Sequence, residues 1–240
     1  MPLLEPPPGW GRDELTKFID LAASNTYATF HNLKADYSKL SGIDATFYKL
    51  IHNLYNTKDW FASFFLMRAH SSFLSAVRLT LSGQIPEAYA GLRLTLENAL
   101  YGFYLAKNPA SRHTWLRRHD SEQAKQKVRN EFRIRTLLKT FQAEDAAEGS
   151  AVENLYERTI DYGAHPNERA LSQSLGMGRG GGKVRFQIIY LNGERSALRE
   201  ALRDAARIGA CALAMFRAVY KERFDLLGLT ATLQQLRQGL

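Results

Sequence analysis

The sequence has very little cysteine: Cys211 is the single one among its 240 residues. One thiol forms no intrachain disulfide and supplies no cysteine-based zinc site, so both kinds of cross-link are excluded. No apolar run approaches the roughly 18 residues that a membrane-spanning helix requires, so we expect no membrane partner. The first residues also lack the basic region that opens a secretory signal. These absences predict a cytoplasmic protein.

Several motifs of familiar catalytic sites are missing as well. No pair of histidines has the spacing and the neighbouring carboxylate of a helical zinc site, and no Gly-x-Ser-x-Gly elbow occurs. Lys183 follows the glycine-rich segment 176–182, but Met177 stands where a P-loop has its first glycine and Val184 replaces the hydroxyl residue. We therefore expect no metal and no cofactor, and we interpret the segment as a loop at a hairpin.

What the sequence does have is an excess of positive charge on a globular composition. It contains 32 Lys and Arg against 24 Asp and Glu, for a net charge of +8, and 45% of its residues are hydrophobic. Nine of the cations fall within 112–139, where Asp120, Glu122 and Glu131 oppose them. Such a segment is typical of a surface that binds a phosphate backbone, and the alternative is a solvated helix face. The candidate nucleic-acid contacts are Arg112, Arg117, Arg118, Lys125, Lys127, Arg129, Arg133 and Arg135.

Apolar residues recur three and four positions apart through most of the chain, which predicts an all-α fold. We expect a flexible, proline-rich lead-in over 1–11, one bundle of six or seven helices over 12–227, and a C-terminal tail over 228–240. A short stretch near 172–191 alternates apolar and polar residues instead, which predicts a small β-hairpin insertion. The alternating apolar residues are Val184, Phe186 and Ile188.

Turn residues place the helix boundaries. The pattern predicts a first helix over 13–40, a break at Ser41-Gly42, and one long helix or two collinear helices over 44–81. A later helix should end near Gly163, ahead of a proline. The helix over 44–81 carries a dense aromatic cluster, which we interpret as core rather than as the wall of a small-ligand pocket. Its members are Trp60, Phe61, Phe64 and Phe65.

Two groups of polar residues are candidates for a site. Arg93, Glu97 and Tyr101 stand four positions apart, so they share one stripe of a helix. Such a stripe is either a surface ion pair or a polar seam that lines the bundle. Arg158 and His165 form an Arg-x6-His pattern at a helix end. Arginine can hold a phosphate and histidine can act as general acid or base, although a His in this position can equally well cap the helix.

These two regions resemble a known family. The segments GLRLTLENALYGFYLAKNP, over 91–109, and LYERTIDYGAHPN, over 155–167, are similar to those of the bacterial HEPN-like helical proteins, especially the DUF5677 group. The resemblance implies a helical bundle that often forms homodimers, and many HEPN proteins are RNases that use an Arg-x4-6-His motif without a metal. Thr159 departs from the more polar residue that active members carry after the arginine.

The sequence therefore leads to two functional hypotheses. In the first, the protein is an HEPN-like RNA-binding protein or metal-independent endoribonuclease. His165 then moves the proton, Arg158 holds the scissile phosphate, Arg93 and Glu97 position the site, and the 112–139 face guides the RNA. In the second, the protein is a non-catalytic helical interaction or homodimerisation module, in which Arg93, Glu97 and His165 form a structural polar network.

Overall fold

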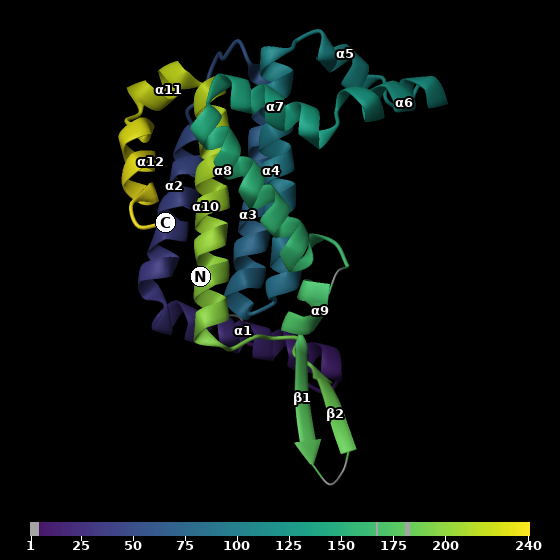
Figure 1. The fold of residues 1–240 in the computed structure, drawn as a ribbon. Coiled ribbons are helices and arrows are strands. Elements are labelled where there is room, and N and C mark those ends of the chain that lie inside the picture. The colour runs from purple at the N-terminus through teal and green to yellow at the C-terminus, as the bar shows by residue number, and fades with distance from the viewer. Residues whose placement is uncertain (1–4, 167, 181–182) are drawn as a thin grey trace.

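Helices make up most of the structure, a computed structural model that describes residues 5–166, 168–180 and 183–240 (Figure 1). None of the helices in these ranges is long and apolar enough to cross a bilayer. The longer helices are α1 (Glu14–Asn32), α2 (Lys34–Ile51), α3 (Trp60–Ser82), α4 (Ile85–Lys107), α7 (Ile134–Glu144), α8 (Ala146–Thr159) and α10 (Arg195–Val219). The shorter ones are α5 (Ser111–Leu116), α6 (Glu122–Glu131), α9 (Glu168–Gln173), α11 (Lys221–Leu226) and α12 (Leu229–Arg237). The predicted all-α class is confirmed.

Helix α10 runs along the middle of the bundle and packs against α2, α3, α4 and α8. Its buried face is rich in alanine, and these small side chains let the neighbouring helices approach closely. At Gly209 even a Cβ atom would stand 2.7 Å from the ring of Phe73. The larger residues that the periodicity assigned to this face, such as Leu202, Ile208 and Phe216, are fully buried.

Two predicted helix boundaries in the N-terminal half are wrong. The first helix ends at Asn32, and α2 runs straight through Ser41-Gly42. Gly42 lies inside a helix because α12 packs on it: a Cβ there would meet a methyl group of Leu236 at 2.5 Å. The prediction of one long helix or two collinear helices over 44–81 is also wrong, because α2 ends at Ile51, α3 begins only at Trp60, and the two lie side by side, with Nε2 of His70 2.6 Å from Oδ1 of Asp44.

The described residues near each end of the chain form short-range or bundle contacts. Residues 1–4 of the predicted lead-in fall outside the described residues, and the backbone N–H of Trp10 closes a turn with the carbonyl of Pro7 at 3.1 Å. The predicted C-terminal tail takes the form of α12, which buries Leu229 and Leu233. Lys39 of α2 holds the end of the chain by donating to the carbonyl of Gln238 at 2.8 Å.

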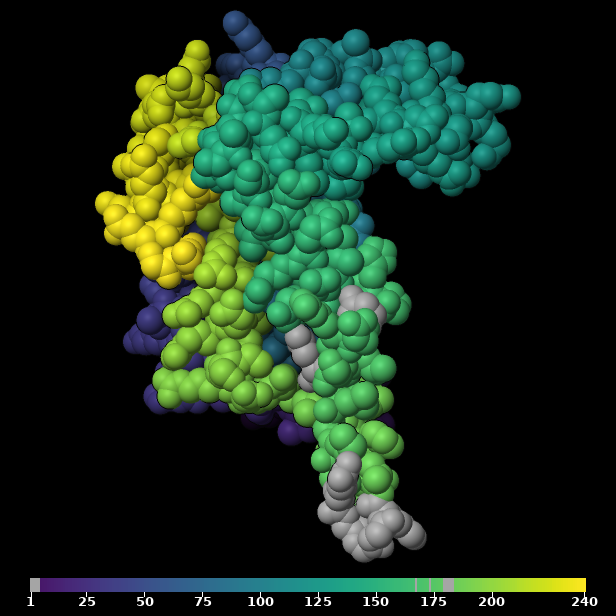
Figure 2. Space-filling model, viewed as in Figure 1, coloured from purple at the N-terminus to yellow at the C-terminus, as the bar shows by residue number. Residues whose placement is uncertain are grey.

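Two parts of the chain project from the bundle (Figures 1 and 2). The predicted hairpin is confirmed as strands β1 (Leu175–Gly180) and β2 (Lys183–Ile188), which pair antiparallel with Met177 opposite Phe186. At the other end of the molecule, α5 and α6 extend sideways from the top of α3 and α4. We call residues 111–137, which comprise α5, α6, their connections and the first turn of α7, the basic arm, because they carry most of the 112–139 cations.

Candidate functional site

The site is built at the end of α8, where the chain passes the start of α4. Helix α8 continues into a single π-helical segment, η1 (Ile160–Ala164), so the predicted helix end near Gly163 is confirmed. Gly163 has φ 158° and presses against α4, since a Cβ there would stand 2.1 Å from the carbonyl oxygen of Pro86. His165 then takes the extended conformation that a residue before proline favours. The close contact at Gly163 fixes where His165 emerges.

His165 meets Arg93, and with it a group of side chains from three elements. Nη1 of Arg93 lies 2.5 Å from Nε2 of His165, whose side chain is exposed. Nε of the same guanidinium donates to Oε1 of Glu97 at 2.8 Å. The hydroxyl of Tyr156, on α8, donates to that carboxylate oxygen at 3.0 Å, and the guanidinium carbon of Arg93 lies 5.0 Å from the centre of the Tyr156 ring. We call these four residues the His165 group.

The chemistry of the His165 group follows from which atoms can donate. A guanidinium has only donors, so Nε2 of His165 must accept, and the ring is then neutral with its proton on Nδ1. Partial burial opposes the charge on Arg93, but the hydrogen bond and charge of Glu97, together with Tyr156, outweigh burial and raise the pKa of Arg93. Burial, with the charge of Glu97 next, raises the pKa of Tyr156. The group thus places a permanent cation and a neutral imidazole side by side at the surface.

Arg158 does not face His165. Its Nη2 donates to Oε1 of Glu200 at 2.9 Å, its Nε donates to Oδ2 of Asp204, and its guanidinium lies 4.7 Å from the centre of the Tyr162 ring. Burial works against the charge of Arg158, but the bond to Asp204 and its negative charge outweigh burial and raise the pKa. Two carboxylates of α10, one buried and one partly exposed, therefore balance the charge of this arginine.

Asp204 is the residue that the sequence reasoning missed. It has no exposed surface, and it accepts hydrogen bonds from Tyr89 at 2.6 Å, from Arg207 at 3.1 Å and from Arg158. A signal was present, because Asp204 lies three positions after Ala201 and four before Ile208, on the apolar face of α10. A buried carboxylate requires a cation, and the arginine of the Arg-x6-His pattern supplies it.

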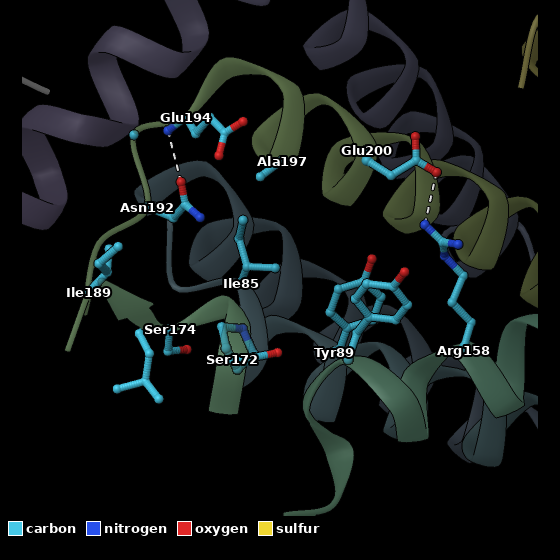
Figure 3. A pocket seen from close by; sticks show the side chains of 15 residues that line it. Ile85, Tyr89, Arg158, Ser172, Ser174, Ile189, Asn192, Glu194, Ala197 and Glu200 are labelled. Atoms are coloured by element: carbon cyan, nitrogen blue, oxygen red, sulfur yellow. Dashed lines mark hydrogen bonds and ion pairs between the residues drawn. The ribbon is translucent and has the colours of Figure 1, made fainter. Parts of the chain in front are cut away.

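Arg158 also lines a cavity of about 620 Å³ between the start of α4, η1 and the base of the hairpin (Figure 3). Tyr89 lies at one end of this cavity beside the Arg158–Glu200 pair, and Ser172 and Ser174 approach from the hairpin side. Tyr162 also lines the cavity, with its ring centre 5.3 Å from that of Tyr89. His165 does not line it. The structure thus separates the two residues of the Arg-x6-His pattern: one lines this cavity and the other belongs to the His165 group.

Tyr101 lies apart from the His165 group, although it shares a helix with Arg93 and Glu97. Its ring stacks with Phe65 and Phe132, at centroid distances of 6.2 and 5.5 Å, and its hydroxyl donates to the carbonyl of Phe132 at 3.3 Å. Burial raises the pKa of Tyr101, with the charge of Glu97 next. This residue joins the base of the basic arm to α3 and α4.

The cations of the basic arm differ in how they are used. Arg112 points inward, where its Nε donates to the carbonyl of Leu105 at 2.9 Å and its guanidinium lies 5.6 Å from the centre of the Phe61 ring. Three others have a polar partner on the arm: Arg117 contacts Asp120 at 2.5 Å, Lys125 contacts Glu122 at 3.4 Å, and Arg133 contacts Asn130 at 3.0 Å. The four predicted contacts that are exposed and form neither an ion pair nor a side-chain hydrogen bond with the described residues are Arg118, Lys127, Arg129 and Arg135.

Within the described ranges, no three His, Cys, Asp or Glu side chains gather in a way that could hold a metal ion. The carboxylate of the His165 group is already shared between Arg93 and Tyr156. No protein-family model, curated protein or solved structure matches this chain.

Proposed function

We propose that the protein is an HEPN-like RNA-binding protein whose basic arm holds the RNA backbone. The observation that supports this most directly is the set of exposed arm cations that have neither an ion-pair partner nor a side-chain hydrogen bond among the described residues: Arg118, Lys127, Arg129 and Arg135. Phosphate groups would supply the missing negative charge and release counterions as they bind. Because the arm stands away from the bundle, a strand can reach it without any rearrangement of the core (Figure 2).

The test is the salt dependence of RNA binding by the full chain. With about four phosphates neutralised, the logarithm of the association constant for single-stranded RNA should fall with the logarithm of salt at a slope of about −3. Lys127→Ala combined with Arg129→Ala should reduce that slope to about −1.4, in fluorescence anisotropy with a labelled RNA.

A matched control removes the same charge elsewhere. Lys34 and Lys221 are exposed and form no ion pair with other described residues, and they lie at the starts of α2 and α11. Lys34→Ala with Lys221→Ala should leave the slope near that of the parent. If both double variants weaken binding equally, the arm is not the binding surface; if the parent does not bind RNA at low salt, the proposal fails.

The endoribonuclease form of this proposal centres on the His165 group, with Arg93 rather than Arg158 as its cation. A scissile phosphate would draw the Arg93 guanidinium toward itself and free Nε2 of His165, which is about 2.5 Å from it. Nε2 would then take the proton of the ribose 2′-hydroxyl as its oxygen attacks phosphorus. The departing 5′ oxygen takes a proton from solvent, which leaves a 2′,3′-cyclic phosphate and a 5′-hydroxyl end.

Cleavage is tested on structured RNA with a chelator present. His165→Ala should abolish production of cyclic-phosphate ends, and Arg93→Ala should reduce it by about a hundredfold or more, as removal of one charge-stabilising donor does. Arg158→Lys, which keeps a cation beside Asp204, should cleave at close to the parent rate. An inactive parent, or an active His165→Ala variant, would overturn the catalytic form and leave RNA binding to be judged on its own test.

A second candidate function is the non-catalytic interaction module, and the contacts of Arg158 favour it. Its charge is balanced by Glu200 and Asp204, so neither the arginine nor the carboxylates need an external ligand. In this form the polar groups fix the positions of α4, α8 and α10, and the exposed surface of the bundle binds the partner. A chain that binds no RNA at low salt but self-associates would support it.

A further inference from the structure

Helix α3 exposes large apolar side chains on the side that faces away from the bundle. Trp60 is 58% exposed, Phe64 51%, Met67 44% and Leu74 45%. The sequence-based interpretation of the aromatic cluster as core thus holds only for its other two members, which are buried. A row of large apolar side chains this exposed along one helix is normally covered, so this face calls for a partner.

The large exposed apolar residues follow one line along α3, with the exposed Arg68 and Ser75 beside it. Successive members are separated by four, three, four, three and four positions, which is the spacing that keeps side chains on one seam of a paired helix. The members of this line, which we call the α3 stripe, are Trp60, Phe64, Met67, Ser71, Leu74 and Arg78. The opposite side of the helix, with Ala62, Ala69 and Phe73, is buried in the core. The stripe therefore points directly outward.

The α3 stripe is symmetric about residue 69, which identifies the partner that it fits. Trp60 and Arg78 lie nine positions on either side of that point, and the next pair in, Phe64 and Leu74, lie five positions from it. Met67 and Ser71 complete the set at two positions. If a second α3 packs antiparallel against the first, Trp60 of each copy lies opposite Arg78 of the other. Phe64 then lies opposite Leu74, and Met67 opposite Ser71. The stripe is therefore complementary to itself, as a two-fold interface requires.

The side chains that would then meet are chemically matched. Arg78 is exposed and forms no ion pair with other described residues, and a guanidinium is well suited to cover the face of an indole such as Trp60. Phe64 would lie against a leucine, and the long Met67 against a serine, so large groups face smaller ones. A parallel arrangement would instead place Arg78 against Arg78, where like charges repel.

The molecule also provides a hollow where the end of a second stripe would sit. Helix α1 crosses α3 near its C-terminal end, and the two helices enclose a groove of about 540 Å³. Phe18, Ile19 and Ala22 of α1 line it together with Ser75 and Arg78 of α3. An antiparallel copy would bring its exposed Trp60 to this groove. The aromatic N-terminal end of one α3 would then fit the apolar groove beside the C-terminal end of the other.

We propose that two copies of this chain associate through α3, packed antiparallel about a two-fold axis at residue 69, with each Trp60 in the α1–α3 groove of the other copy. The same surface appears on both sides of such an interface, so the assembly closes as a dimer. This proposal stands on the α3 stripe alone and holds whether or not the chain binds RNA.

The first experiment measures the oligomeric state of the full chain by sedimentation over a range of concentrations. The parent should sediment as a dimer, and Phe64→Glu, which puts two charges into the seam, should sediment as a monomer. Phe186→Glu is the matched control, because Phe186 is equally large and 68% exposed but lies on the hairpin. It should leave the dimer intact, and far-UV circular dichroism should show the parent's helical content in both variants.

Cross-linking then tests the direction of packing. In an antiparallel pair, the two copies of residue 71 lie four positions apart along the axis, or about 6 Å, whereas the two copies of residue 78 lie about 27 Å apart. A short bis-maleimide should therefore join Ser71→Cys chains and leave Arg78→Cys chains unjoined, while the parent, whose Cys211 is buried, stays unlinked. A monomeric parent, a dimer that survives Phe64→Glu, or equal cross-linking at both positions would each overturn the proposal.

Discussion

The hydroxyl of Tyr89 and the buried carboxylate of Asp204 lie 2.6 Å apart, in the contact between α4 and α10. Burial, reinforced by the negative charge of Asp204, raises the pKa of Tyr89, so the phenol stays protonated and donates. The same carboxylate accepts from Arg158 of α8. Three helices thus share one anion, and this contact explains why Arg158 is a structural cation here rather than a free one.

We expect Asp204→Asn to be strongly destabilising. The amide keeps the shape of the side chain but leaves Arg158 and Arg207 without the buried charge that both contact. Removing one partner of a buried ion pair costs about 3–5 kcal/mol, and the partial exposure of Arg158, 30%, reduces the expected loss to about 2–4 kcal/mol. Urea unfolding, monitored by circular dichroism, measures this loss in the free energy of unfolding.

Glu200→Gln is the control for that prediction. Glu200 contacts the same two arginines but is 45% exposed, so water can replace it and the expected loss is about 0–1 kcal/mol. Similar losses in the two variants would show that Asp204 is not the centre of the network.

Apolar spacing predicted the helices well because most of them bury one face, as α10 does. It failed where glycine serves packing rather than a turn: Gly42 reads as a break in the sequence, but it lies inside α2 because Leu236, almost 200 positions later, rests on it. The contacts of the candidate site were likewise predictable only where they are local in the sequence. Arg93 and Glu97 were recognised from spacing within one helix, whereas the contact of Arg158 with Asp204 joins segments that no local pattern relates.

Gly163→Ala should both destabilise the fold and displace His165. The added Cβ would stand 2.1 Å from the carbonyl oxygen of Pro86, so η1 must move away from α4. We expect a loss of about 1–3 kcal/mol, which for a chain of this size lowers the melting temperature by several degrees. Gly193→Ala is the matched control, because a Cβ there meets no atom within 4 Å. A similar loss in both variants would rule out the contact with Pro86 as the cause.

Burial of Cys211 predicts a loss of stability in alkaline solution. Burial raises the pKa of this thiol from 9.0 to about 12, so the folded chain keeps a proton that the unfolded chain releases. The contribution of the protonated thiol to the free energy of unfolding is fully present below about pH 9 and is lost as the pH rises toward 12. Urea unfolding at about pH 8 and about pH 10.5 should show a smaller decrease for Cys211→Ala than for the parent. Equal decreases in the two proteins would contradict the prediction.

The hydrogen bond between Arg93 and His165 predicts a single tautomer for the histidine. Since arginine can only donate, His165 should carry its proton on Nδ1, and long-range nitrogen–proton correlation spectra distinguish that form directly. Arg93→Ala should move the ring toward a mixture of tautomers, because the acceptor atom loses its donor. Arg158→Lys, which keeps a cation beside Asp204, should leave the His165 signals in place, since the residue at 158 contacts Glu200 and Asp204 instead. A change of tautomer in the Arg158 variant alone would contradict the prediction. It would show that Arg93 is not the cation that holds His165.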